Sequence, residues 1–229
     1  MKKIFVGSFY ILLASNLALA QEYKDDSFGS KNKIYGRTKI SVGFERQKFN
    51  DKMYKKLLEI AGEGKNSVVN RVNKAAIFNI GYNMYYKMYK NIHLLAGADF
   101  KLRFDVNRRG PVFQATTIAE STNAVNDDVY IDDFAKANLK FGAKFILCEY
   151  ISIETYITGG AGFIKTSTPD KTQIRLGYNT GVGTDIVFND RFFVGAEYLW
   201  IGSDAEFTIG QKAFKFNAYS LVAKAGFQF

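Results

Sequence analysis

Cysteine, histidine and proline are all scarce in this chain of 229 residues. Cys148 is the one cysteine, so no disulfide can form within the chain. His93 is the one histidine, and the sequence contains no metal-ligand spacing, phosphate-binding loop or nucleotide fingerprint. Pro111 and Pro169 fall between segments of alternating polarity, which suits a sheet protein because proline cannot donate to a strand ladder. We therefore expect a β-rich chain with no metal and no cofactor.

Apolar runs long enough to form a transmembrane helix are also lacking. The run Ile4–Leu13 is too short to cross a bilayer as a helix. Lys2 and Lys3 precede it and the small residues Ala18–Ala20 follow it, which is typical of a secretory signal and its cleavage site. We predict that residues 1–20 form this signal; an uncleaved N-terminal anchor, the alternative, needs a longer apolar stretch.

Alternation of apolar and polar residues is abundant, and residues 217–229 at the carboxy terminus alternate strictly. One face holds Leu221, Ala223, Ala225, Phe227 and Phe229, and the other holds Ser220, Val222, Lys224, Gly226 and Gln228. Successive strand side chains point to opposite faces, so this pattern is typical of a lipid-exposed barrel strand. Alternation recurs in seven more segments, around residues 34–48, 74–86, 92–105, 134–147, 151–165, 173–188 and 192–201.

These eight segments predict an all-β fold, an eight-stranded antiparallel transmembrane β-barrel of the up-and-down type, over residues 34–229. Residues 21–33 would form a polar periplasmic tail. Tight turns are expected at 87–91, 148–150 and 189–191, and longer links at 49–73, 106–133, 166–172 and 202–213. Short turns on one side and longer loops on the other indicate periplasmic and extracellular ends. A soluble β-sandwich is the structural alternative.

The inward faces of the predicted strands collect charges of both signs, interleaved with glycines. These charged residues are Arg37, Lys39, Glu45, Asp99, Lys101, Arg103, Lys140, Lys144, Glu154, Arg175, Asp185 and Glu197. An eight-stranded barrel is only wide enough for side chains to fill it. We therefore expect charge pairs across a plugged, polar lumen, in which glycines make room for long side chains. An ion-conducting pore is the alternative, but small barrels lack the bore of the larger porins.

The signal, the eight segments, the long loops on one side and the terminal Gly226-Phe227-Gln228-Phe229 resemble the small outer-membrane barrels of the OmpX, Ail and Opa family. The Lys-, Asn-, Ile- and Tyr-rich composition resembles the Adr-type surface adhesins of obligate intracellular bacteria. The resemblance implies insertion by the barrel-assembly machinery through Gly226, Phe227 and Phe229, adhesion to host cells, and capture of host serum or matrix proteins such as vitronectin. OmpX-type proteins project long β-hairpins above the membrane, whereas the loops here do not alternate in that way.

The first long link contains a predicted basic helix. Apolar residues recur at helical spacing between a start at Asn50 and a stop at Gly62, and Lys52, Lys55 and Lys56 occupy the remaining surface. We interpret this segment as an amphipathic helix at the outer rim that contacts anionic lipopolysaccharide or a host glycan. The alternative is a helix that folds back on the barrel mouth with its lysines in water.

The second long link separates its charges by sign. Arg108 and Arg109 open it, and Asp127, Asp128, Asp132 and Asp133 close it. Basic and acidic stretches on separate loops suit recognition of a protein partner, and an ordinary charged rim is the alternative. The net charge of +9 suits lipopolysaccharide, glycosaminoglycan or nucleic acid, and composition alone does not choose among them. For a barrel in the outer membrane we expect outer-membrane lipid and lipopolysaccharide as partners, and no nucleic acid.

Catalysis is not predicted. His93 falls near a predicted turn, and no serine or aspartate can be placed beside it. We predict a multi-pass protein of the bacterial outer membrane whose extracellular loops mediate adhesion or capture host proteins. The alternatives are a structural barrel without a ligand, a small pore and an outer-membrane lipid-modifying enzyme. The predicted ligand-binding residues are Lys52, Lys55, Lys56, Arg108 and Arg109.

Overall fold

The computed structural model describes the predicted barrel and parts of its longer links. The described residues are 33–61, 68–69, 72–105, 113–116, 126–167, 171–209 and 212–229. The predicted signal, residues 1–20, lies outside them, as does the predicted tail apart from its last residue.

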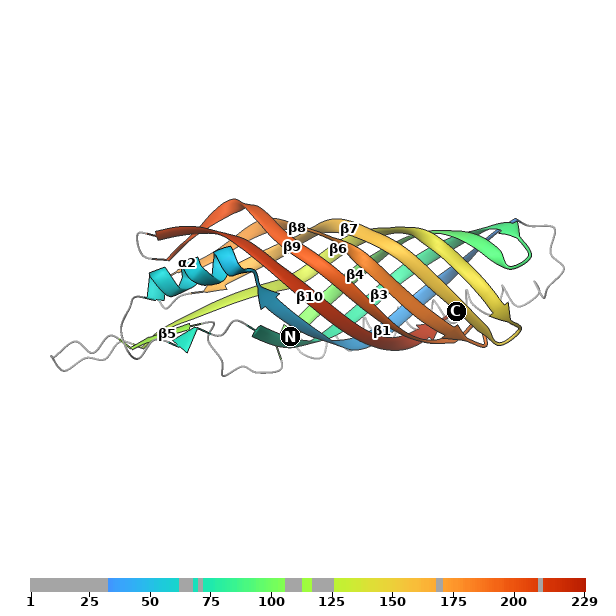
Figure 1. The fold of residues 1–229 in the computed structure, drawn as a ribbon, viewed down its shortest axis with the longest axis horizontal. Coiled ribbons are helices and arrows are strands. Elements are labelled where there is room, and N and C mark those ends of the chain that lie inside the picture. Colours follow the sequence, from blue (N-terminus) through green and yellow to red (C-terminus); the bar gives the residue numbers. More distant parts are fainter. Residues whose placement is uncertain are drawn as a thin grey trace, which may run out of the picture.

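Eight long strands form a closed antiparallel ring (Figure 1). In ring order they are β1 (Ile34–Phe49), β3 (Val72–Tyr89), β4 (Ile92–Asp105), β6 (Asn126–Cys148), β7 (Ile151–Ser167), β8 (Thr172–Phe188), β9 (Phe192–Ile209) and β10 (Lys212–Gln228). Pairing of β1 with β10 joins the first strand to the last and closes the ring. Two short strands, β2 (Val68–Val69) and β5 (Phe113–Thr116), pair with each other, and β5 also pairs with β6. The predicted eight-stranded all-β fold is confirmed.

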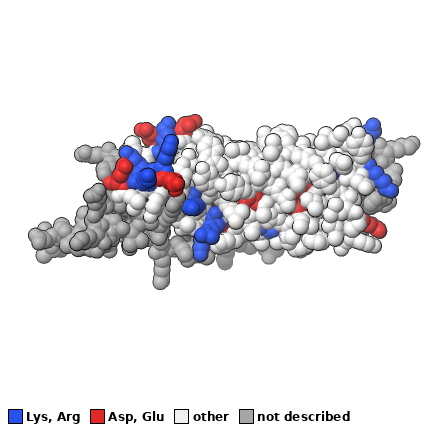
Figure 2. Space-filling view, viewed as in Figure 1, with Lys and Arg blue, Asp and Glu red and all other residues white. Residues whose placement is uncertain are grey.

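Side chains alternate around the ring between an apolar outside and a filled inside. On β1, Val42 is 63% exposed, while the neighbouring Ser41 is 2% exposed. The same period of two on the other strands places the large apolar residues outside and most of the charged ones inside. Figure 2 shows the result on one face: the middle of the ring is nearly free of charged atoms, which gather toward its two ends.

One end of the ring, which we call the turn end, carries three tight turns and the carboxy terminus (Figure 1). The turns join β3 to β4, β6 to β7 and β8 to β9, where they were expected from the sequence. In the last of them Asn189 and Asp190 have φ angles of 49° and 52°. Asn and Asp tolerate this left-handed region better than other non-glycine residues, so the sequence suits a turn of this length.

The opposite end, which we call the helix end, carries α2 (Asp51–Ala61). The strands run further here than the sequence predicts. β9 and β10 continue through most of residues 202–213, which were expected to be a loop, and β6 and β7 pair out to Tyr130 and Ser167. The loop sequences do not predict these paired extensions of the strands, which the structure shows. The reason is that the apolar residues Phe207, Phe214 and Phe216 alternate inward and are buried.

The helix α2 begins where the sequence predicts. Asn50 Oδ1 accepts a 2.7 Å hydrogen bond from the Met53 N–H, which caps the first turn. The Asn50 N–H in turn donates to the Asn217 carbonyl oxygen at 3.1 Å, so the helix start is attached to β10. The predicted stop, Gly62, lies outside the described residues. Within the part of the chain that is described, no helix is long and apolar enough to cross a membrane.

Candidate functional site

A network of buried ion pairs fills the middle of the ring. Lys39 Nζ lies 2.7 Å from Glu154 Oε2 and 2.8 Å from Asp185 Oδ2. Lys224 Nζ lies 3.1 Å from Asp185 Oδ1 and 2.7 Å from Glu197 Oε1. Glu154 is 0% and Glu197 1% exposed, so no water-filled bore runs beside these carboxylates. The predicted pairing of charges across the lumen is confirmed for Lys39, Glu154 and Asp185.

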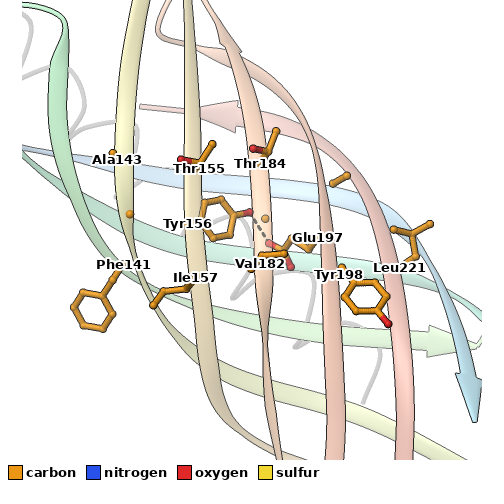
Figure 3. A pocket seen from close by; sticks show the side chains of 13 residues that line it. Phe141, Ala143, Thr155, Tyr156, Ile157, Val182, Thr184, Glu197, Tyr198 and Leu221 are labelled. Carbon is orange, nitrogen blue, oxygen red and sulfur yellow. Dashed lines mark hydrogen bonds between the residues drawn. The ribbon is translucent and has the colours of Figure 1, made fainter. Parts of the chain in front are cut away.

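Tyr156 enters the same network from β7. Its hydroxyl donates to Glu197 Oε1 at 2.7 Å, the dashed line in Figure 3, and accepts a 2.7 Å hydrogen bond from Lys224 Nζ. Lys140 Nζ lies 4.7 Å from the centre of the Tyr156 ring, and Lys101 pairs with Glu197. The sequence places Tyr156 on the inward face but does not identify it as the centre of the network, because nothing in the pattern says which inward side chain reaches furthest.

A second ionic layer lies closer to the helix end. Arg103 pairs with Glu45 at 3.2 Å and with Asp133 at 2.9 Å, and Lys136 pairs with the same two carboxylates at 3.1 and 2.6 Å. Sequence reasoning does not include Lys136 and Lys224 in the lumen set. It also assigns Asp133 to a surface loop, which is wrong: β6 begins at Asn126 rather than near residue 134, so Asp133 is an inward strand residue.

Two other predicted lumen residues are less enclosed than expected. Arg175 has the inward position but an exposed side chain. The ladder between β8 and β9 begins at Tyr178, so Arg175 lies beyond the closed part of the wall. Arg37, near the turn end of β1, is only partly buried.

The turn end is filled by a cluster of aromatic and polar side chains. The Tyr35 hydroxyl lies 2.8 Å from Nδ1 of the buried His93. The Tyr85 hydroxyl donates to Glu154 Oε1 at 2.8 Å, and Lys144 pairs with Asp190 at 2.6 Å. His93 is therefore a hydrogen-bonded lumen residue. Among the described residues, no group of three His, Cys, Asp or Glu side chains is placed to hold a metal ion.

The helix end of the lumen is closed by a cluster that we call the apolar plug. It comprises Phe49 from β1, Met53 and Leu57 from α2, and Phe207, Phe214 and Phe216 from the β9–β10 hairpin. The rings of Phe49 and Phe216 meet edge to face, with their centroids 6.0 Å apart. The expectation of a wholly polar lumen is wrong at this end, because the inward residues of the strand extensions are aromatic.

Burial of one face of α2 in the apolar plug leaves its lysines in water. Lys52, Lys55 and Lys56 are all exposed, and Lys56 forms a 3.4 Å surface pair with Glu59. The helix thus folds back on the barrel mouth, as the alternative in the sequence analysis predicted. Contact of its lysines with an anionic surface stays a prediction. Arg108 and Arg109 lie outside the described residues.

The predicted assembly residues form part of the seam between β1 and β10. The Phe229 N–H donates to the Thr38 carbonyl at 2.9 Å, and the Thr38 N–H donates to the Phe229 carbonyl at 3.0 Å. Phe227 and Phe229 both point outward and are exposed. A Cβ at Gly226 would overlap the carbonyl oxygen of Ile40, so this position accepts only glycine without movement of the seam. A role of these residues in assembly stays a prediction.

Two of the hollows in the described part of the chain lie on the outer wall and adjoin each other. The basic groove, of about 630 Å³, is at the helix end, and its lining includes Arg46, Lys48, Lys52, Tyr198 and Tyr219. The apolar trough, of about 820 Å³, crosses the wall from β6 to β10. Figure 3 shows its short side chains, among them Ala143, Thr155 and Thr184, beside a row of larger ones, Phe141, Ile157, Val182 and Tyr198.

The chain is similar to known proteins at the level of solved structures. No protein-family model matches the chain, and no curated protein matches it. Ail, the attachment invasion locus protein of Yersinia pestis, is 17% identical with a TM-score of 0.43, covering 85% of this chain and 99% of its own. Another Ail structure is a complex with the heparin analogue sucrose octasulfate. Neisserial surface protein A is 8% identical with a TM-score of 0.46, covering 86% and 98%. The narrower resemblance to Adr-type adhesins stays a prediction.

Proposed function

We propose that this protein crosses a bacterial outer membrane as the closed ring. The support is the closed ring with large apolar side chains exposed on its outer wall, the middle of which is nearly free of charge on the face shown in Figure 2. Only helices and closed barrels satisfy every backbone group in hydrocarbon. Aromatic side chains flank this belt on both sides, as in membrane barrels, with Tyr89 and Phe192 at the turn end and Tyr198 and Trp200 toward the helix end. The long links then place the helix end outside the cell.

We further infer that the helix end binds an anionic host surface or a host protein. The observation that carries this is α2: its apolar face is fixed in the plug while Lys52, Lys55 and Lys56 project into water. A surface held in this way loses little conformational freedom on binding, which lowers the cost of association. Capture of host serum or matrix proteins such as vitronectin, which the family resemblance implies, belongs to this proposal.

Charge reversal tests the binding surface. Replacing Lys55, Lys56 and Arg108 by Glu should slow association of the refolded protein with immobilised heparin and with host cells by at least about tenfold at low ionic strength, because rim charges steer encounter. Lys52 stays unchanged because it also lines the basic groove. The matched control reverses Lys33, Lys90 and Arg191, which are exposed at the turn end and give the same change of net charge.

A structural barrel without a ligand is the second candidate, and the packed lumen favours it. The buried ion pairs and the apolar plug make the ring rigid whether or not anything binds outside. If both triple variants associate with heparin and cells as fast as the unchanged protein, this second role becomes the better conclusion.

A further inference from the structure

The basic groove and the apolar trough adjoin each other on the outer wall. Tyr198 and Leu221 line both of them. The groove is rich in polar and cationic groups, whereas the trough is floored by small residues and bordered by apolar ones. A polar compartment next to an apolar one, on the outer wall of a ring with an uncharged belt, is the shape of an amphiphile rather than of a soluble ligand.

The strand register gives the direction in which the two hollows follow each other. One row of register partners runs across the wall through Arg46, Leu221, Tyr198, Val182, Ile157, Phe141 and Ala96. Arg46 lies near the helix end of β1, and Ala96 lies near the turn end of β4. The row therefore descends from the helix end into the belt as it passes around the ring.

The trough follows the next row toward the turn end. Its register partners are Ala143, Thr155, Thr184, Ala196 and Ala223, all of them small. The row beyond that is large and apolar again, with Phe145, Ile153, Ile186 and Val194. Short side chains between two rows of mostly larger ones form the furrow, whose volume of about 820 Å³ can take an extended hydrocarbon chain.

The basic groove supplies positive charge at the upper end of this furrow. Arg46, Lys48 and Lys52 are exposed, and none of them forms an ion pair with another described residue. The exposed Lys74 is the register partner of Arg46 on β3 and adds a fourth cation. The rings of Tyr198 and Tyr219 stack below them, with centroids 6.1 Å apart and planes at 16° to each other. Tyrosine at this depth is typical of the headgroup level of a bilayer.

We propose that the groove and the trough together bind one membrane lipid with a phosphate-bearing headgroup. The phosphate lies between Arg46 and Lys48, where the guanidinium fork can donate two parallel hydrogen bonds to its oxygens. An acyl chain passes between Tyr198 and Leu221, which line both hollows, and runs along the trough. The inference rests on the membrane location proposed above, and it is independent of any host partner.

Titration with short-chain lipids tests the headgroup part. The refolded protein in dodecyl maltoside is titrated with dioctanoyl phosphatidic acid, with dioctanoylglycerol and with inorganic phosphate, and the unfolding midpoint is followed. Phosphatidic acid alone should raise the midpoint and saturate, because a ligand that binds only the folded state stabilises it. If inorganic phosphate raises the unfolding midpoint equally, the site binds anions without needing a lipid. If dioctanoylglycerol raises the midpoint equally, the cations play no part in binding. Either result overturns the proposal.

Two pairs of variants locate the lipid. Arg46→Gln with Lys48→Gln should weaken phosphatidic acid binding by at least about tenfold, because charge-assisted hydrogen bonds are lost. The control, Lys165→Gln with Lys215→Gln, removes two other exposed cations and should leave affinity unchanged. Ala196→Leu fills the trough and should weaken binding, whereas Ala225→Leu, outside the trough, should not. Equal affinities within either pair would overturn the site.

Failure of the lipid site is distinguishable from failure of the membrane location. If the ring is not a membrane protein, the unchanged chain will not insert into vesicles or migrate differently on gels with and without boiling. If only the lipid site is wrong, all variants insert and migrate normally but bind phosphatidic acid alike.

Discussion

The ring of Tyr156 occupies the space that a side chain at Gly183 would need. The two residues are register partners on β7 and β8, and a Cβ at Gly183 would lie 2.6 Å from Tyr156 Cζ and 2.7 Å from its hydroxyl oxygen. The glycine allows the ring to lie against the wall, from which its hydroxyl reaches Glu197. Gly183 on β8 thereby sets where the Tyr156 ring lies among the buried ion pairs that the other strands contribute.

Gly183→Ala should therefore destabilise the barrel by about 1–3 kcal/mol, the usual effect of overpacking a filled interior. Urea unfolding in lipid vesicles, followed by the fluorescence of the one tryptophan, Trp200, measures the change. Gly159→Ala is the matched control, because the nearest atom to its added Cβ, the Asn179 carbonyl oxygen, is 3.7 Å away. Equal losses at both positions would show that Tyr156 does not need the space.

Glu197→Gln should cost about 3–5 kcal/mol, because it leaves buried lysines short of a counter-charge. Lys101 and Lys224 both pair with this carboxylate inside the closed wall. Glu206→Gln, on the exposed face of the same strand, should change stability by about 1 kcal/mol or less. Adding Lys224→Met to Glu197→Gln should recover part of the loss, and additive losses in this double variant would contradict a shared network.

A packed lumen also predicts the electrical behaviour of the barrel. The protein inserted in a planar bilayer should show no steady large conductance, because the ion-pair network and the apolar plug occupy successive levels of the lumen. A stable open level in the unchanged protein would support the pore alternative.

The sequence predicts the ring well because alternation with a period of two indicates which side chains face outward and which face the interior of the ring. Val42 against Ser41, or Leu221 against Val222, can be assigned without coordinates. The same signal is misleading where the apolar face of a strand changes from the outside to the inside of the ring, as beyond Gly202, where Phe207 is buried and Glu206 is exposed. It therefore misses the strand extensions around Phe207 and Phe214, and it assigns Asp133 to a loop.

The site is less predictable than the ring because it depends on distances around the circumference. Tyr156 becomes central only through its reach to Glu197, and the two residues are 41 positions apart. The basic groove is similar: Lys48 and Tyr219 face each other across the seam between β1 and β10. The register of β1 against β10 is fixed when the ring closes, and no local sequence pattern indicates it.

Leu57→Asp should release α2 from the apolar plug. Leu57 is 0% exposed, and placing a carboxylate there costs about 2–5 kcal/mol through lost packing alone. Trypsin should then cleave at Lys52, Lys55 and Lys56 at least about tenfold faster, while the barrel itself stays folded. Leu58→Asp is the control, since Leu58 on the same helix is 41% exposed. Similar cleavage of both variants would mean that the helix is not docked through Leu57.

Phe229→Lys separates folding of the barrel from its recognition during assembly. The side chain is outward at the turn end, and the substitution keeps both backbone hydrogen bonds to Thr38. A lysine at the edge of the hydrocarbon costs only about 0–1 kcal/mol, which is too little to prevent folding. Refolding of the purified variant into vesicles should therefore be normal, whereas its yield in the outer membrane of living cells should fall. Tyr150→Lys, which changes another exposed aromatic residue at the turn end, should leave that yield unchanged. Normal yields of the Phe229 variant would refute a terminal assembly signal, and a failure of both variants to accumulate would point to general loss of the aromatic belt instead.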